Sequence, residues 1–215
     1  MTALVRYLLA DVLRTQRYLP PLLAFAAVLA MFNAGDAGPP LSAYAGPSAF
    51  FYPVAVWLTI VIATAEDPVR RAVTVTTAGG WGRAQGAVTA LSCLAVTVVA
   101  AFAALVPVLT QSRPYPLTTI ASGFAALLVC GLTGVGVGVL CTRPIITQHG
   151  WSVLTAAALI LLTFLFGQTP PIGNVLGALG HETNLAQNLA ISGTAAGFLV
   201  AAATLAARTL GPRRN

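Results

Sequence analysis

Few side chains in this chain could take part in chemistry, and the densest group of them lies in one polar stretch. The 215 residues include 11 arginines, five acidic residues and two histidines, but no lysine. Glu66, Asp67, Arg70 and Arg71 stand close together in the segment 66–71. Two carboxylates and two guanidinium groups at this spacing can form ion pairs and charge-assisted hydrogen bonds with a partner. The stretch therefore suits recognition of a charged surface.

The rest of the sequence carries no motif that is typical of covalent or acid–base catalysis. Without a lysine the chain has no Walker A phosphate loop and no Schiff-base nucleophile. It contains no HExxH sequence, no paired aspartates and no Ser/His couple expected on one face. His149 and His181 are expected at opposite faces of a membrane, and Cys93, Cys130 and Cys141 are typical of small buried hydrophobic residues. We therefore expect no catalytic residue, cofactor or metal site in this chain.

The elements that position these residues are apolar. Hydrophobic residues make up 57% of the chain and charged residues 7%, whereas a soluble domain carries roughly a quarter charged residues. The chain has six apolar blocks, and most approach the roughly 20 residues that cross a 30 Å hydrocarbon core. They are Tyr18–Phe32, Pro47–Ala65, Ala87–Thr110, Thr118–Cys141, Gly150–Gly167 and Leu189–Leu210. The first is short and carries Pro20-Pro21, so it must tilt or thin the bilayer to cross. The composition predicts an all-α membrane protein with a six-span domain over residues 18–210, located in the plasma membrane.

The arginines predict the orientation of the spans. Ten of the 11 fall before the first span, between the second and third, between the fourth and fifth, or after the last, and only Arg113 falls on the other side. Because arginine is enriched in cytoplasmic loops, both termini are expected in the cytoplasm, including a short tail at 211–215. This placement at span ends also argues against nucleic-acid binding, which needs a basic surface on one domain.

Polar residues inside the spans are mostly hydroxyls. No carboxylate falls in the middle of a block, so the ionisable groups at membrane depth that ion-coupled transporters use are absent from the sequence pattern. For the threonines and serines we expect hydrogen bonds to the carbonyl four residues earlier or to a neighbouring helix.

Residues 1–17 form an amphipathic stretch. On a helical wheel, one half-circle is filled by Leu4, Val5, Leu8, Leu9, Val12 and Leu13. Arg6, Arg14 and Arg17 cluster on the opposite side. This pattern is typical of a helix that lies in the membrane interface. The alternative is a frayed cytoplasmic lead-in to the first span.

The segment 66–85 carries start and stop signals for a short helix. Asp67 is a favourable N-cap residue and Pro68 a favourable first helical residue. Gly79-Gly80 favours termination. A helix of about ten residues is therefore expected on the cytoplasmic side, between the second and third spans. The alternative is a solvated loop whose arginines only enforce the topology.

This layout resembles the membrane subunit of ABC-2-type export permeases, of the compact kind found in high-GC Gram-positive bacteria. The resemblance covers the whole chain in architecture and the segment EDPVRRAVTVTTAGGWGRAQ (66–85) in sequence. It implies that a coupling helix docks on a separate ATPase subunit, which would hold ATP and magnesium. By position, Glu66, Asp67, Arg70 and Arg71 would make that contact. It also implies a second permease chain, identical or homologous.

The external stretch 168–188 is too short and broken to span, yet too apolar for an ordinary exposed loop. It resembles the re-entrant helix pair that closes the outer mouth in the same family, with Pro170, Pro171, Ile172 and Leu176 as gate residues. The alternative is an interfacial loop packed on the outer surface.

Four glycines in the fourth span, Gly131, Gly134, Gly136 and Gly138, are spaced to let membrane helices approach closely. We expect them to serve packing, within one chain or between two.

Together these features favour a transporter membrane subunit that dimerises, binds an ATPase and exports a hydrophobic or amphipathic compound by alternating access. Two alternatives from other classes remain: a membrane enzyme that acts on a lipid or an intramembrane peptide bond, and a non-transporting immunity or sensor protein.

Overall fold

The computed structural model describes residues 2–35, 38–111, 113–142, 149–166, 171–181 and 184–210. Over these ranges the chain is helical and has no strand, which confirms the all-α fold class. The helices are α1 (Thr2–Thr15), α2 (Leu19–Asn33), the 3-10 turn η1 (Ser42–Tyr44), α3 (Ala45–Ala63), α4 (Pro68–Thr77), α5 (Trp81–Thr110), α6 (Leu117–Leu140), α7 (His149–Leu165), α8 (Ile172–His181) and α9 (Leu185–Leu210).

Each of the six apolar blocks falls on a helix, but the helices differ in length. Four are long and apolar enough to cross a membrane: Ser42–Ala63, Trp81–Thr110, Leu117–Leu140 and Leu185–Thr209. The other two blocks form shorter apolar helices, Leu19–Asn33 and Gly150–Leu165. At 1.5 Å per residue, the 15-residue α2 extends about 22 Å, less than a 30 Å core. Length and composition thus identify four spanning helices.

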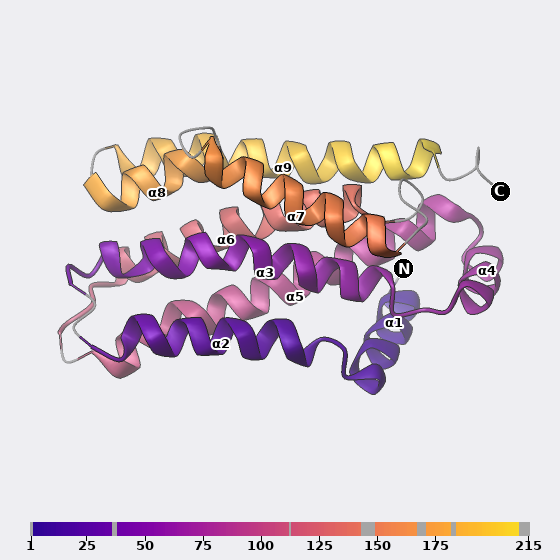
Figure 1. Cartoon of the computed structure of the whole chain (residues 1–215), viewed down its shortest axis with the longest axis horizontal. Coiled ribbons are helices and arrows are strands. Elements are labelled where there is room, and N and C mark those ends of the chain that lie inside the picture. The colour runs from indigo at the N-terminus through magenta and orange to yellow at the C-terminus, as the bar shows by residue number, and fades with distance from the viewer. Residues whose placement is uncertain are drawn as a thin grey trace.

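The four long helices lie side by side along the long axis of the molecule: α3, α6 and α9 run in one direction, and α5 runs in the opposite direction (Figure 1). α1, α4 and the carboxyl end of α9 gather at one end of this bundle, and α8 lies beside α9 at the other. We refer to these as the α4 end and the α8 end. The described arginines at the α4 end belong to α1, its junction with α2, α4, the start of α5 and the end of α9, whereas Arg113 lies at the α8 end.

Helix α6 lies at the centre and packs against α3, α5 and α9. A Cβ atom at Gly134 would lie 2.7 Å from the Tyr52 carbonyl oxygen, and one at Gly138 would lie 3.1 Å from the Val56 carbonyl oxygen. These two glycines therefore bring the backbones of α6 and α3 into direct contact.

The other two glycines of the stripe face different neighbours. A Cβ atom at Gly136 would lie 2.7 Å from Leu199 Cδ2 on α9. One at Gly131 would overlap Val96 on α5 and the ring of Phe51 on α3. All four positions thus serve contacts within one chain, and the stripe lets three helices close on α6.

Most hydroxyl groups in the long helices bond to the preceding turn, as expected from the sequence. Thr59, Thr89 and Thr133 each donate to the carbonyl oxygen four residues earlier, at 2.8 to 3.2 Å. Tyr44 is an exception, because its hydroxyl donates to the Ala104 carbonyl oxygen at 2.9 Å and joins the start of α3 to α5. The hydroxyl of Ser192 is buried without a partner among the described residues.

Helix α1 crosses the α4 end of the bundle at a steep angle to α2 (Figure 1). Leu8 and Val12 are buried against the bundle, whereas Leu9 and Leu13 are exposed. Only part of its apolar face is therefore left for a membrane interface, and the rest holds α1 to the helical core. Gln16, with a φ of 52°, ends the helix and turns the chain into α2.

Candidate functional site

The polar segment between α3 and α5 contains a helix where the start and stop signals predict one. Asp67 has extended backbone angles and precedes α4, with Pro68 as its first residue. Gly79 and Gly80 have φ values of 77° and 128°, which a residue with a Cβ adopts only under strain, and they end the segment before α5 begins. The carboxylate of Asp67 accepts no capping hydrogen bond, so this residue contributes backbone geometry and an exposed charge.

Arg71 faces inward and is 7% exposed. Its guanidinium donates to the Ala63 carbonyl oxygen at 2.7 Å and to Gln85 Oε1 at 3.0 Å. It also lies over the Trp81 ring, 5.1 Å from the centroid. One side chain of α4 is therefore bonded to the end of α3 and to the start of α5, which fixes α4 to both long helices.

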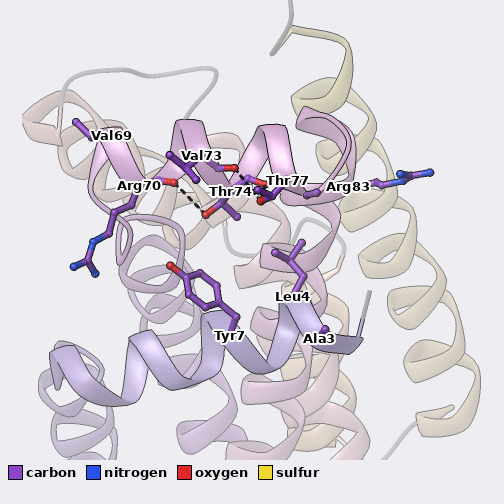
Figure 2. A pocket seen from close by; sticks show the side chains of 10 residues that line it. Ala3, Leu4, Tyr7, Val69, Arg70, Val73, Thr74, Thr77 and Arg83 are labelled. Carbon is purple, nitrogen blue, oxygen red and sulfur yellow. Dashed lines mark hydrogen bonds between the residues drawn. The ribbon is translucent and has the colours of Figure 1, made fainter.

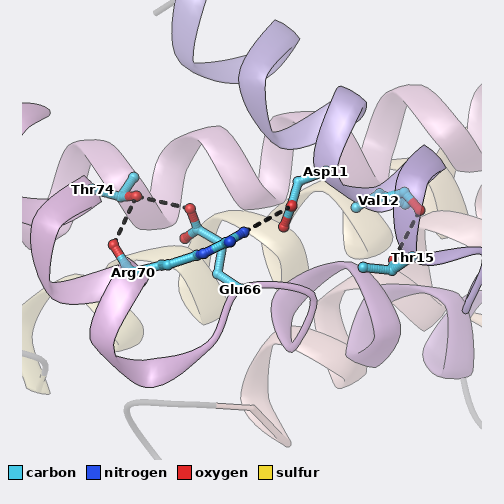
Figure 3. A network of polar contacts seen from close by, with 6 residues as sticks. All are labelled: Asp11, Val12, Thr15, Glu66, Arg70 and Thr74. Carbon is cyan, nitrogen blue, oxygen red and sulfur yellow. Dashed lines mark hydrogen bonds and ion pairs between the residues drawn. The ribbon is translucent and has the colours of Figure 1, made fainter.

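Glu66 takes part in a second internal contact. The Thr74 hydroxyl lies 2.8 Å from Glu66 Oε1 and 3.1 Å from the Arg70 carbonyl oxygen (Figure 3). Thr74 is buried and Glu66 is half-buried. This contact holds the approach to α4 against the second turn of the helix and engages one oxygen of the Glu66 carboxylate within the chain.

Arg70 points away from the bundle and its side chain is 69% exposed. Its Nη1 lies 3.8 Å from Asp11 Oδ1 on α1 (Figure 3). The Asp11 side chain is 16% exposed, but the guanidinium lies in water near the 4 Å limit of an ion pair. The contact therefore contributes between about 0 and 1 kcal/mol, and the guanidinium can exchange it for another carboxylate. Of the four residues predicted to meet a partner, Arg70 and Asp67 are exposed, and Glu66 and Arg71 are engaged within the chain.

A groove of about 790 Å³ separates α4 from α1. Figure 2 shows Leu4 and Tyr7 rising from α1 toward Val73 on α4. Val69 and Val73 are 73% and 60% exposed, and their spacing of four residues places them on the same face of α4. Arg70 and Arg83 lie at opposite ends of the groove (Figure 2). The arrangement is an apolar slot with a cation at each end.

The second wall of this groove was not predicted, because the sequence pattern assigned the apolar residues of α1 to lipid. The residue that could have indicated this wall is Tyr7, an aromatic residue one turn of the helix after Leu4. The buried partners of Arg71 were missed as well. Gln85 lies on α5 and is fully buried, and its Nε2 has no partner among the described residues.

The predicted outer gate coincides with α8. Ile172, Val175 and Leu179 are buried against the bundle, and Leu176 is half-buried. Pro171 precedes the helix, and Pro170 lies outside the described residues. α8 contacts α9, α3 and α6, so this apolar helix closes the α8 end of the bundle.

Within the described part of the chain, no three histidine, cysteine, aspartate or glutamate side chains come together as a metal site would require. Cys141, just after α6, is free and buried. A thiol enclosed in this way is typical of a structural cysteine.

Comparison with protein-family models, with curated proteins and with solved structures gives no match for this chain. Its function therefore has to be inferred from its residues and their geometry.

Proposed function

We propose that this chain is the membrane permease subunit of an ATP-driven exporter and that an ATPase subunit binds the groove between α1 and α4. The observation that carries the proposal is the groove itself. It combines exposed valines with Arg70 and Arg83 at its ends. Apolar contacts would supply affinity for an inserted segment, and carboxylates at its two ends would set its register.

The proposed topology has six spans, both termini in the cytoplasm of a plasma-membrane protein, and α1 in the inner interface. The gathering of arginines at the α4 end supports this orientation. The two short apolar helices, α2 and α7, would cross by local thinning of the bilayer or with help from flanking residues.

The connection of α4 to its neighbours supports a mechanical role. Arg71 bonds to Ala63 at the end of α3 and to Gln85 near the start of α5. A displacement of α4 by the ATPase would therefore reach two long helices at once. Closure of the ATPase on ATP would switch a substrate path between inward and outward access, and α8 would act as the gate on the outside. The working unit would be two permease chains with two ATPase chains.

The test is recruitment of an ATP-binding-cassette ATPase, which the proposal expects to be encoded beside this chain. Co-purification from detergent-solubilised membranes is compared for the wild type, Arg70→Glu and Arg113→Glu. Both arginines are exposed, but Arg113 is at the α8 end. Reversal at Arg70 should weaken ATPase binding at least about tenfold, because an attraction at the rim becomes a repulsion. Arg113→Glu should bind normally.

Equal recruitment by both variants would refute the groove as the docking site. Failure of the wild type to recruit any ATPase would refute the exporter assignment and leave the sensor or immunity class. Hydrolysis of a lipid or a peptide by the purified chain would instead establish a membrane enzyme.

A further inference from the structure

A second groove, of about 710 Å³, lies between α3 and α7. α3 lines it with a stripe of side chains from Pro53 to Thr64, and α7 lines it with a stripe from Val153 to Ile160. Arg17, at the junction of α1 and α2, stands at the α4 end of the groove and is the one charged residue among the described residues that line it. Trp57 is 45% exposed in the middle of the wall.

The groove is closed toward the α8 end. There the hydroxyls of Tyr52 and Thr163 lie 3.2 Å apart, and the rings of Tyr52 and Phe164 meet edge to face with centroids 6.3 Å apart. From this junction the groove runs between the two helices toward Thr64 and Val153. An occupant must therefore enter from the side or from the α4 end.

The length of the groove matches half a bilayer. From Pro53 to Thr64 an α-helix rises about 16 Å, and half of a 30 Å hydrocarbon core is about 15 Å. The walls over this length are almost entirely apolar, with Thr64 at the end nearest Arg17. These dimensions fit a hydrocarbon chain from one leaflet.

Arg17 is placed to hold a polar head at the end of such a chain. Gln16, in the left-handed region, redirects the backbone so that Arg17 precedes α2 rather than continuing α1. The Arg17 side chain is exposed and makes no hydrogen bond or ion pair with another described residue. A guanidinium binds a phosphate through two parallel hydrogen bonds. The unpaired positive charge of Arg17 favours a head group with a net negative charge over a zwitterionic one, whose own cation it would repel.

We propose that the groove between α3 and α7 binds an anionic phospholipid from the arginine-side leaflet, with its phosphate on Arg17 and one acyl chain along Trp57. The site uses other helix faces than the α1–α4 groove and does not depend on the transport function. A bound lipid would fill the space that separates α7 from α3 and link α7 to the junction of α1 and α2.

The experiment uses Trp57 as the reporter, with Trp81 and Trp151 replaced by phenylalanine. The purified full chain in neutral detergent is titrated with phosphatidylglycerol or phosphatidylcholine brominated in mid-chain, and quenching of Trp57 is measured. Phosphatidylglycerol should quench with saturation near one lipid per chain, and phosphatidylcholine should bind about tenfold more weakly. Arg17→Gln should remove this preference, whereas Arg14→Gln should keep most of it.

A second pair of variants tests the groove itself. Ala157→Phe places a ring in the groove and should abolish saturable quenching, while Ala158→Phe, on the same exposed stretch of α7 but outside the groove, should not. The proposal is overturned if both lipids quench equally, if Arg17→Gln keeps the preference, or if a second copy of the chain seals the groove so that neither lipid quenches.

Discussion

At the scale of single residues, the segment between α3 and α5 divides its two adjacent arginines between different roles. Neighbouring residues on a helix point about 100° apart. If one faces the bundle, the other cannot. Arg71 is buried with bonds to Ala63 and Gln85, and Arg70 is exposed beside Asp11. Arg71 thus positions α4, and only Arg70 offers its charge to a partner.

Removal of the inward arginine should be far more costly than removal of the outward one. Arg71→Ala leaves the Gln85 side chain and the Ala63 carbonyl without their donor and should lower the free energy of unfolding by about 2–4 kcal/mol. Arg70→Ala should cost less than about 1 kcal/mol. Thermal unfolding in mild detergent measures both, and amide exchange over 68–78 shows whether α4 is released. Equal losses would contradict the assigned roles.

The sequence could not distinguish these two arginines. Cap and stop signals located α4, because they depend on Asp67, Pro68 and the glycine pair, which are local. Which side of the helix faces the bundle depends on Gln85 and Trp81, which belong to the next helix. The sequence therefore predicted where α4 lies along the chain, but not which of its two arginines faces the bundle.

At the scale of elements, α3 and α6 can pack closely because α6 has glycines at the points of contact. The glycine stripe was visible in the sequence, but its partners were not. Gly134 and Gly138 face the backbone of α3, which cannot move aside, whereas Gly136 faces the end of a leucine side chain. Substitutions along one stripe should therefore differ in effect.

Gly134→Ala and Gly138→Ala should each destabilise the protein by about 1–3 kcal/mol, because the new methyl group forces α3 and α6 apart. Gly136→Ala should cost less, since Leu199 can change its rotamer. Gly197→Ala is the matched control. Nothing lies within 4 Å of its added Cβ, and it should be neutral or slightly stabilising. Thermal unfolding in detergent gives the ranking, and a uniform response would show that backbone contact does not limit the packing.

At the scale of the whole molecule, the two ends of the bundle differ in charge. The six apolar blocks and the arginine pattern predicted where the helices lie along the chain. The blocks Tyr18–Phe32 and Gly150–Gly167 end within two residues of α2 and α7, so the short length of these two helices could be read from the sequence. The grooves could not be predicted, because they arise from the angles between helices.

The difference in charge gives a prediction for the orientation. In a background without Cys93, Cys130 and Cys141, single cysteines at Ser42, Gln111 or Asn184 should react with an impermeant maleimide in intact cells. A cysteine at Thr76 should react only after permeabilisation, because the arginine-rich end should stay in the cytoplasm. Labelling of Thr76 from outside would reverse the proposed topology.

The last prediction concerns α8, which closes the other end of the bundle. Val175 and Leu179 are buried there, so cysteines at these positions should be protected from aqueous reagents at rest. If α8 is an outer gate, it must leave the bundle during transport, and addition of ATP to the complex with the ATPase should make both cysteines reactive. Gly177→Cys serves as the control, because Gly177 is exposed with nothing near its added Cβ and should react in every state. Protection of Val175 and Leu179 throughout ATP turnover, with Gly177 always reactive, would make α8 a static cap on the bundle.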